Sequence, residues 1–355
     1  DTFTWDEVMQ LPDKALWLEA AQLEIDELAK KRKTWSIVPK SQAGSIKPLP
    51  TTWVFRLKRH PDGTPKKRKA RICVRGDLQE GPAEVFAPVC EFSSVRLFLA
   101  LCLLLQWPSV ALDFANAFCQ SHFPKLMEAV YLHPPRGFYN DVRGHSYLLL
   151  LKSMYGLREA PRLWFENLFG ELLSDELGFT QSANDPCLLF RHDMIVIVYV
   201  DDCCIMGPQE NVDEIKRKLK LEFGTVEDGQ LRKLLGVRYE WKLDSKGEQY
   251  LELKMDDKAN AIIKSYEKIT GTTPKVQSTP GTPGQVLIKN SGEPYMRDEY
   301  RSMIGKLMFY TTKIAPECAF SVGQLARHMQ NPNKDHWKAV DRIVGYLRGK
   351  EKHRL

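Results

Sequence analysis

The stretch MIVIVYVDDCCIMG, residues 194–207, decides how this chain folds. An apolar run leads into Tyr199-Val200-Asp201-Asp202, and a second apolar run begins at Cys203. This pattern predicts a buried strand, a tight turn that carries two adjacent carboxylates, and a strand that returns beside the first. Two ionised acids beside an apolar hairpin are costly unless a cation neutralises them. Because Asp also favours ordinary turns, a surface turn without function is the alternative for this stretch alone.

A third acid stands in a similar setting far upstream. Residues 110–114, VALDF, predict a strand that ends at Asp113 and Phe114. If this strand is a neighbour of the hairpin, three carboxylates converge at one edge of a sheet. Mg²⁺ prefers such a set of few carboxylates together with substrate phosphates. Two ions about 4 Å apart can activate a 3′-hydroxyl and stabilise a departing pyrophosphate in an in-line displacement.

Positive charge is concentrated in one segment. The 355 residues carry a net charge of +6 and are 43% apolar and 27% charged, as expected for a globular chain of two or three domains. Between Arg56 and Arg75, however, there are nine Lys or Arg and one acid, Asp62. Residues 53–60, a turn at 61–64 and residues 69–75 predict a β-hairpin with one basic face. Such a face favours a polyanion, and a merely solvated hairpin is the alternative.

Cysteine usage argues against a protein built on disulfides or zinc, and hydropathy argues against a protein that spans a membrane. The eight cysteines form no C-x-x-C pair, and most lie in apolar runs. This usage predicts a reducing, intracellular environment without a zinc site or a disulfide framework. The longest apolar run, residues 97–105, is too short to cross a bilayer. The basic stretches 30–33 and 65–69 mimic nuclear-import signals, although functional elements of the fold already explain them. The expected location is intracellular, in a cytoplasmic particle, in the nucleus or in both.

The remaining patterns predict an α+β protein. Helices are expected at residues 13–32 with Asp13 as the cap, at 93–105 with Ser93 or Ser94 as the cap, at 161–177 and at 211–223. Short strands are expected at 129–132, 147–151 and 249–253, and another begins at 234–237. Residues 275–285 indicate a linker, and helices at 296–313, 316–329 and 334–348 follow it. Strands dominate the middle of the chain and helices its end.

Taken together, these segments resemble the reverse transcriptases of copia-type LTR retrotransposons (Pseudoviridae). The resemblance extends from about residue 17 to residue 349, and the order and spacing of its motifs carry it. The motifs are WVFRLK at 53–58 with Asp62-Gly63, KAR at 69–71, FAPV at 86–89, LD at 112–113 with NAF at 116–118, YGL at 155–157 with PRLW at 161–164, NDPC at 184–187, YVDD at 199–202, YR at 300–301 with IG at 304–305, and YLRG at 346–349.

This resemblance implies a right-hand polymerase with an antiparallel palm sheet and a C-terminal helical thumb. The N-terminal helical extension and the start of the fingers are expected at residues 1–52, and the fingers with the basic hairpin at 53–107. The palm is expected at 108–254, with part of the fingers within 119–165. A linker at 255–295 and a thumb at 296–355 complete the implied division.

The resemblance also implies a reaction and its acids. Asp113, Asp201 and Asp202 are the expected catalytic residues and metal ligands, and the main-chain carbonyl of Phe114 completes one coordination shell. The implied activity is that of an RNA-directed DNA polymerase that also copies DNA and extends a primer with dNTPs. Its cofactor is two Mg²⁺ ions, with Mn²⁺ as a substitute. Its partners are the RNA or DNA template, the primer strand and the dNTP, and no membrane.

Basic and aromatic residues complete the implied nucleotide site. Lys58, Lys69 and Arg71 are expected to clamp the triphosphate, and strand alternation leaves open whether Lys69 or Arg71 points inward. Phe118 matches the position of an aromatic ring under the sugar, where it would clash with a 2′-hydroxyl. A plain core Phe is the alternative.

A loop and a hairpin further along match the family's remaining substrate contacts. Tyr155 and Gly156 match the loop beneath the nucleotide, with close backbone approach as the role of Gly156. Leu235 and Gly236 match the primer grip, a hairpin that holds the terminal phosphates of the primer.

Several expectations stay open at this stage. Arg162 and Trp164 either brace the following helix or contact template, and Lys218 or Lys220 is a candidate proton donor to pyrophosphate. The family continues into an RNase H domain shortly after residue 349, so the sequence predicts DNA synthesis without RNA degradation, unless that domain was cut away. The rival interpretations are a domesticated nucleic-acid-binding scaffold without catalysis and a template-independent terminal transferase.

Overall fold

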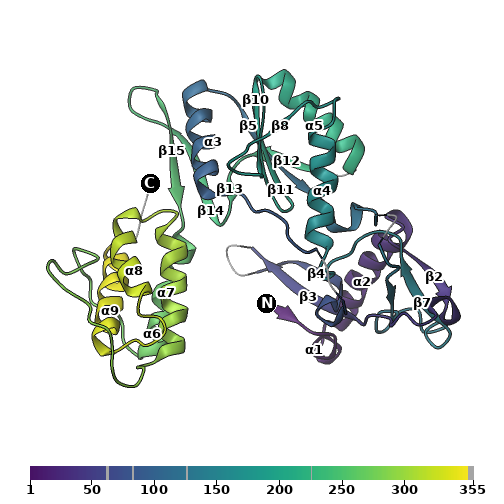
Figure 1. Ribbon diagram of the computed structural model, residues 1–355, viewed down its shortest axis with the longest axis horizontal. Helices are drawn as coiled ribbons and strands as arrows, with labels where there is room; N and C mark the ends of the chain where they lie inside the picture. Colours follow the sequence, from purple (N-terminus) through teal and green to yellow (C-terminus); the bar gives the residue numbers. More distant parts are fainter. Residues whose placement is uncertain (61–63, 82–83, 125–126, 225, 351–355) are drawn as a thin grey trace. The chain divides into compact units, whose positions relative to one another are not determined.

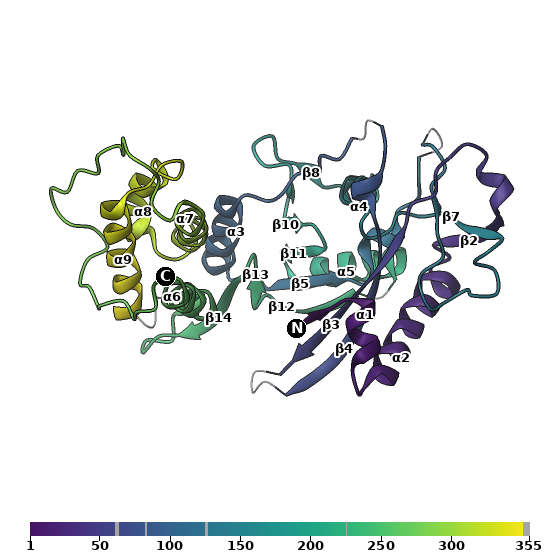
Figure 2. The same cartoon turned by 90° about the horizontal axis from the view of Figure 1, so that it is seen from below.

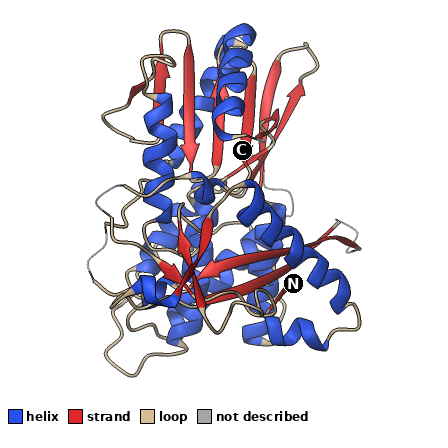
Figure 3. Ribbon diagram, turned by 90° about the vertical axis from the view of Figure 1, so that its right-hand side faces the viewer, coloured by secondary structure: helices blue, strands red, loops and turns tan. Residues whose placement is uncertain are grey.

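The chain forms two compact units. The computed structural model describes residues 1–60, 64–81, 84–124, 127–224 and 226–350. The first unit comprises Asp1–Phe98 and Pro108–Gly229, and the second comprises Leu99–Trp107 and Gln230–Leu355. The chain contains both helices and strands (Figure 3), and the described ladders between neighbouring strands are antiparallel. The expected class, a mixture of helices and antiparallel sheets, is confirmed.

A six-stranded sheet forms the centre of the first unit. Its strand order is β12-β5-β11-β10-β9-β8. The strands are β5 (Ser109–Phe114), β8 (Thr180–Gln181), β9 (Leu188–Arg191), β10 (Met194–Tyr199), β11 (Asp202–Met206) and β12 (Val226–Gln230). The predicted hairpin is therefore confirmed as β10 and β11, and the upstream strand β5 pairs directly with β11.

Two helices cover one face of this sheet. They are α4 (Ala160–Leu172) and α5 (Gln209–Phe223), and Figure 1 shows both beside the strands. Leu163, Leu168 and Leu172 of α4 are buried at helical spacing, as are Val212, Ile215, Leu219 and Phe223 of α5. Leu168 and Leu172 of α4 and the four side chains of α5 join Leu112 and Phe114 in one apolar core. Burial of that core holds β5 and the hairpin in register.

The basic hairpin belongs to a smaller sheet of order β1-β3-β4. Its elements are β1 (Thr2–Phe3), α1 (Trp5–Gln10), α2 (Lys14–Ile25), the π-helical turn Asp26–Lys31, β3 (Thr51–Arg59) and β4 (Pro65–Val74). Figure 2 shows α2 beside β3 and β4. Trp17 and Ala21 of α2 pack with Phe55, Ala70 and Ile72 of the hairpin, so one face is apolar and the other is left for charge.

A third sheet and several short segments complete the first unit. The sheet has the order β2-β7-β6, with β2 (Trp35–Pro39), β6 (Tyr131–Leu132) and β7 (Ser146–Leu150). Single 3₁₀ turns occur at Lys40–Ala43, Gly76–Leu78 and Ala117–Gln120. Helix α3 spans Phe92–Leu105, and its residues from Leu99 onward are assigned to the second unit.

The second unit combines a small sheet with a helical bundle. The sheet has the order β13-β14-β15, with β13 (Lys233–Leu234), β14 (Val237–Leu243) and β15 (Gln249–Lys254). The helices are α6 (Asp256–Thr270), α7 (Arg297–Thr311), α8 (Ala319–Ala326) after a 3₁₀ turn at Pro316–Cys318, and α9 (Lys334–Gly349). None of the helices in the described part of the chain combines the length and apolar character needed to cross a lipid bilayer.

Several local predictions are corrected. Asp13 precedes α2 but makes no capping hydrogen bond, because its carboxylate binds the Arg68 guanidinium, with Nε at 2.8 Å. Helix α3 begins at Phe92, so Ser93 and Ser94 lie inside its first turn and cannot be its cap.

Three further predictions also differ from the structure. Helix α4 ends at Leu172, five residues before the predicted 177. Residues 234–237 do not begin one strand, because a tight turn separates β13 from β14. The expected linker at 255–295 contains α6, whose buried residues Ala259, Ile262 and Tyr266 recur at helical spacing. The hairpin turn at residues 61–63 lies outside the described residues.

Candidate active site

The carboxylates of the predicted site lie at one edge of the central sheet. In the ladder between β5 and β11, Asp113 is directly opposite Asp202. Cα atoms of such cross-strand partners are about 4.5–5.5 Å apart. Asp201 occupies the turn between β10 and β11, and all three side chains are exposed and line the same cleft. Three acids that are distant in the sequence are thus brought together by strand pairing.

The turn that carries these acids is held in a strained shape. Val200 has a φ of 57°, in the left-handed region that β-branched residues rarely occupy. The indole Nε1 of Trp164 donates a hydrogen bond of 2.7 Å to the Val200 carbonyl. Trp164 is itself buried in α4 against the rings of Phe114 and Phe223. The core therefore fixes the turn. Trp164 braces this turn, whereas the predicted alternatives were bracing of the following helix and contact with template, and template contact stays untested.

Phe114 contributes to the cleft through its position in β5. Its side chain is 2% exposed and packs in the apolar core, so it faces away from the acids. The residue is nevertheless part of the cleft lining beside Asp113. Two residues later, Asn116 has a φ of 54°, so the chain turns sharply as it leaves the sheet edge.

Basic residues line the same cleft, which has a volume of about 620 Å³. Lys58 of β3 and Lys67, Lys69 and Arg71 of β4 all contribute to it. The prediction treated Lys69 and Arg71 as alternatives for the inward-facing position, and this was wrong. Residues two apart in a strand share a face, and both side chains line the cleft.

The electrostatics of the basic face favour an anion. Burial lowers the pKa of Lys69, and the neighbouring charges of Arg71 and Lys58 lower it further. The Arg71 guanidinium lies over the ring of Tyr155, 4.3 Å from the centroid. Clustered positive charges repel one another, and a bound polyanion relieves this repulsion.

Tyr155 forms part of the wall of the cleft, and Phe118 packs against it. Tyr155 lines the cleft, and burial raises the pKa of its phenol. Phe118 is half-buried and packs edge-on against Tyr155, with centroids 5.3 Å apart. Phe118 therefore contacts a ring that lines the cleft, and its predicted contact with a sugar stays a prediction.

Gly156 is needed for a different close approach from the one predicted. Its φ is +93°, and a Cβ atom at this position would lie 2.1 Å from the Val74 carbonyl oxygen. The Val74 N–H donates to the Tyr155 carbonyl at 2.7 Å. The glycine therefore lets this loop lie against β4, and its contact with a nucleotide stays a prediction.

The donor set suits a magnesium site that substrate completes. Within the described ranges, no three His, Cys, Asp or Glu side chains are already arranged around a common metal position. Two paired carboxylates and a third beside them, all exposed to one cleft, nevertheless match the preference of Mg²⁺ for few carboxylates plus phosphates. The residues present fit such ions.

Comparison with known proteins places the chain in a family. Residues 32–280 match the family model described as reverse transcriptase (RNA-dependent DNA polymerase). This chain belongs to the reverse transcriptase family. The prediction made from the motifs is confirmed.

Relatives of this reverse transcriptase chain are transposon polyproteins. It is 30% identical to the retrovirus-related Pol polyprotein from transposon TNT 1-94 of Nicotiana tabacum, over 97% of this chain and 26% of that protein. It is 31% identical to the polyprotein from transposon RE1 of Arabidopsis thaliana, over 90% of this chain and 21% of that protein. The chain spans about a quarter of the length of these relatives. The expectation about RNase H therefore stays a prediction.

One solved structure aligns with most of this chain at low overall similarity. It is a foamy viral protease-reverse transcriptase in complex with double-stranded DNA, and it is 15% identical to this reverse transcriptase chain. The alignment covers 93% of this chain and 47% of that one, with a TM-score of 0.48.

The predicted primer grip forms a tight turn in the second unit. Leu235 and Gly236 have φ values of 52° and 79°, and they connect the paired residues Leu234 and Val237 of β13 and β14. Positive φ at both central residues is the geometry of a type I′ hairpin turn. The hairpin that the resemblance implies is present, and its contact with primer is untested.

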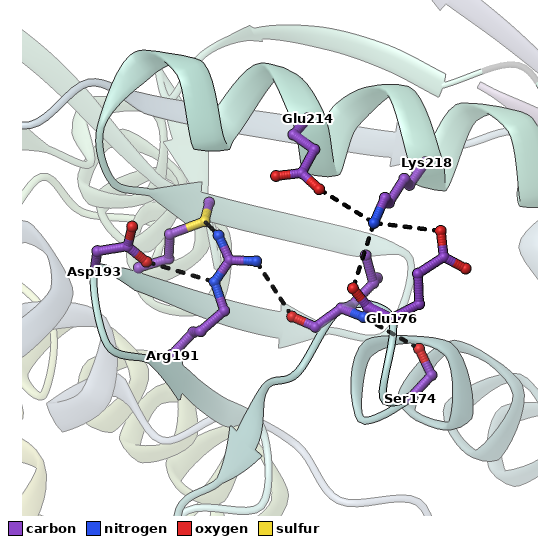
Figure 4. Close-up of polar contacts among 8 residues, drawn as sticks. Ser174, Glu176, Arg191, Asp193, Glu214 and Lys218 are labelled. Atoms are coloured by element: carbon purple, nitrogen blue, oxygen red, sulfur yellow. Dashed lines mark hydrogen bonds and ion pairs between the residues drawn. The ribbon is translucent and has the colours of Figure 1, made fainter.

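Lys218 has a different role from the suggested proton donor. Figure 4 shows its ammonium group between the carboxylates of Glu214, at 3.1 Å, and Glu176, at 3.3 Å. Hydrogen bonds to Glu214, and then to Glu176, raise the pKa of Lys218. Lys218 therefore ties α5 to the segment after α4, and it is absent from the described lining of the cleft.

Sequence reasoning missed two carboxylates in the first unit. Asp185, 3% exposed, accepts hydrogen bonds from the Ser94 hydroxyl at 2.5 Å and from the Glu91 N–H at 3.0 Å. It thereby anchors the start of α3 to the loop before β9, and its place in the NDPC motif was the available signal. Glu24 of α2 lines the cleft, and nothing in the sequence pattern of that helix singled it out.

Proposed function

We propose that this chain is the DNA-synthesising part of a retrotransposon Pol polyprotein. It extends a primer with dNTPs on an RNA template and also copies DNA. The observation that carries this proposal is the pairing of Asp113 with Asp202 beside Asp201, in a cleft whose other side is basic. The polyprotein relatives and the family match support it.

The division into polymerase subdomains follows from this proposal. The six-stranded sheet with α4 and α5 is the palm, and the hairpin of β3 and β4 with α2 belongs to the fingers. Helices α6 to α9 belong to the thumb, and the turn at Leu235 and Gly236 is the primer grip.

The acids act by position and charge. Asp113, Asp201 and Asp202, with the carbonyl of Phe114, are the residues that would hold two Mg²⁺ ions. Such ions activate a 3′-hydroxyl and neutralise a leaving pyrophosphate in an in-line displacement. The strained turn keeps the acids at the sheet edge before substrate arrives, so little reorganisation is needed during the reaction.

The basic side chains bind and orient the triphosphate. Lys58, Lys69 and Arg71 donate charge-assisted hydrogen bonds to its oxygens, which places the α-phosphate near the acids. Phe118, supported by Tyr155, excludes a 2′-hydroxyl from the sugar position. Phe118→Ala is therefore expected to accept ribonucleotides; an unchanged ratio of dNTP to rNTP incorporation in single-nucleotide assays would contradict this role.

A primer-extension assay tests the proposed function. The parent protein with Mg²⁺, a primed RNA template and dNTPs is expected to extend the primer. Asp201→Asn, which keeps the side-chain shape and removes the charge, should bind the same duplex without extending it. Binding without extension by the parent protein would favour a nucleic-acid-binding scaffold. Extension of a blunt primer without template would favour a terminal transferase.

A further inference from the structure

One carboxylate of the cleft has no role in the reaction described above. Glu24, one residue before the end of α2, lines the cleft together with Lys69 and Arg71. Its Oε1 atom is buried and has no hydrogen-bond partner in the described part of the chain. A buried oxygen without a partner is uncommon in proteins and requires an explanation.

The main chain of β4 holds this carboxylate in place. Strand β4 is at the edge of its sheet, so alternate N–H groups point away from β3. The N–H of Val74 is used by the Tyr155 carbonyl, at 2.7 Å. The N–H of Ile72, two residues earlier, faces the Glu24 carboxylate and lowers its pKa. One carboxylate oxygen thus serves as the acceptor for this N–H group at the edge of β4. A neutral acceptor could do the same, so this contact does not explain why the side chain carries a negative charge.

The charge of Glu24 acts on the two basic residues that the proposed function assigns to the triphosphate. The positive charges of Arg71 and Lys69 stabilise the ionised carboxylate, and Glu24 in turn stabilises the charged form of Lys69. An ionised Glu24 therefore offsets part of the positive potential that these residues offer to phosphate. In a half-buried site such a charge is screened much less than at the surface.

The carboxylate changes its charge near neutral pH. Burial raises the pKa of Glu24 to about 7, although the Ile72 N–H and the charges of Arg71 and Lys69 oppose this rise. The group is therefore mostly ionised at pH 8 and mostly protonated at pH 6. The titratable groups whose charges couple to it are Lys69, Arg71 and Cys73 of β4, Glu27 after α2, Cys119 after β5 and Tyr155 before α4.

We propose that Glu24 is a positioning residue that sets how tightly the cleft holds polyphosphate. In its ionised form it competes with bound phosphate oxygens for Lys69 and Arg71, so it weakens the binding of incoming dNTP and of the pyrophosphate product. Release of pyrophosphate after each addition becomes easier. This inference rests on the proposed function, because it takes the cleft to be the triphosphate site.

Glu24→Gln is the informative variant, because it keeps an oxygen for Ile72 and removes only the charge. At pH 8, calorimetry with pyrophosphate and Mg²⁺ should show about tenfold tighter binding to Glu24→Gln than to the parent protein. The KM for dTTP in primer extension should fall by a similar factor. At pH 6 the two proteins should converge, because the parent carboxylate is protonated there.

Two further variants separate charge from structure. Glu19→Gln makes the same charge change at an exposed residue of the same helix, outside the described cleft lining, and should match the parent at both pH values. Glu24→Ala, which also removes the acceptor for Ile72, should shift pyrophosphate affinity in the same direction as Glu24→Gln.

The outcomes are distinguishable. Pyrophosphate binding by Glu24→Gln that equals or falls below the parent at pH 8, or a difference that is the same at both pH values, overturns the inference. If the variants behave as expected but the parent protein does not extend a primer, the proposed function fails and the polyphosphate site stands. If the parent protein extends primers and no variant changes pyrophosphate affinity, only the role of Glu24 fails.

Discussion

The acidic edge and the basic hairpin line one cleft but are held there in different ways. Asp113 and Asp202 have short side chains on directly paired residues of a central sheet, and a buried Trp164 braces the adjacent turn. Lys69 and Arg71 have long side chains on an edge strand. The main chain therefore places the acids, whereas side-chain packing and neighbouring charges place the bases. We therefore expect substitution of an acid to abolish most of the activity, and substitution of a basic residue to reduce it less.

The largest effect is expected at the acidic edge. Asp113→Asn keeps the shape of the side chain and removes a charge that metal ions require, so kcat for primer extension should fall by at least about 10³-fold. Duplex affinity, measured by fluorescence anisotropy, should stay close to that of the parent protein. A loss of less than tenfold in kcat would remove Asp113 from the catalytic set.

The next effect is expected where the loop before α4 meets the hairpin. Gly156→Ala should destabilise the first unit by about 3 kcal/mol, because φ is +93° and the added Cβ would lie 2.1 Å from the Val74 oxygen. Gly170→Ala is the matched control, since a Cβ there meets nothing within 4 Å. Denaturant unfolding of both variants measures the difference in stability. Equal stability would show that the loop shifts to make room for the added Cβ atom at little cost.

A smaller effect is expected on the basic face. Lys69→Ala removes one charge-assisted hydrogen bond worth about 1.5–2 kcal/mol, so KM for dNTP should rise about 10- to 30-fold while kcat changes little. Lys66→Ala removes the same charge from an exposed residue of β4 outside the described cleft lining and should leave KM unchanged. Steady-state kinetics with dTTP test both. A fall in kcat as large as that of Asp113→Asn would abolish the distinction between the two regions.

The smallest effect is expected at Trp164, whose indole holds the turn between β10 and β11. Trp164→Phe retains an aromatic ring and loses the hydrogen bond to the Val200 carbonyl, which is worth about 1 kcal/mol. The rate of single-nucleotide addition should fall about fivefold. Trp337→Phe is the control, because the Trp337 indole N–H is buried without a partner among the described residues. Equal rates for the two variants would mean that the strained turn does not need this bond.

Much of the fold could be predicted because apolar runs and turn residues lie together in the sequence. The hairpin of β10 and β11 and the helices α7 to α9 follow from local patterns. The helix α6 was missed although Ala259, Ile262 and Tyr266 have helical spacing, because the nearby prolines favoured a linker. Asp13 was misassigned as a cap because its partner, Arg68, lies far away in sequence on another element.

The sequence by itself determined the family, the two acids of the central turn and the concentration of basic residues in one hairpin. The acids and the basic residues are properties of short segments, and the family follows from the order and spacing of motifs along the chain. Only the tertiary structure decided that Asp113 lies opposite Asp202, that Lys69 and Arg71 both line the cleft, and that Glu24 joins them. Strand pairing and burial act between residues distant in the sequence, and no local pattern encodes which distant partner each residue meets.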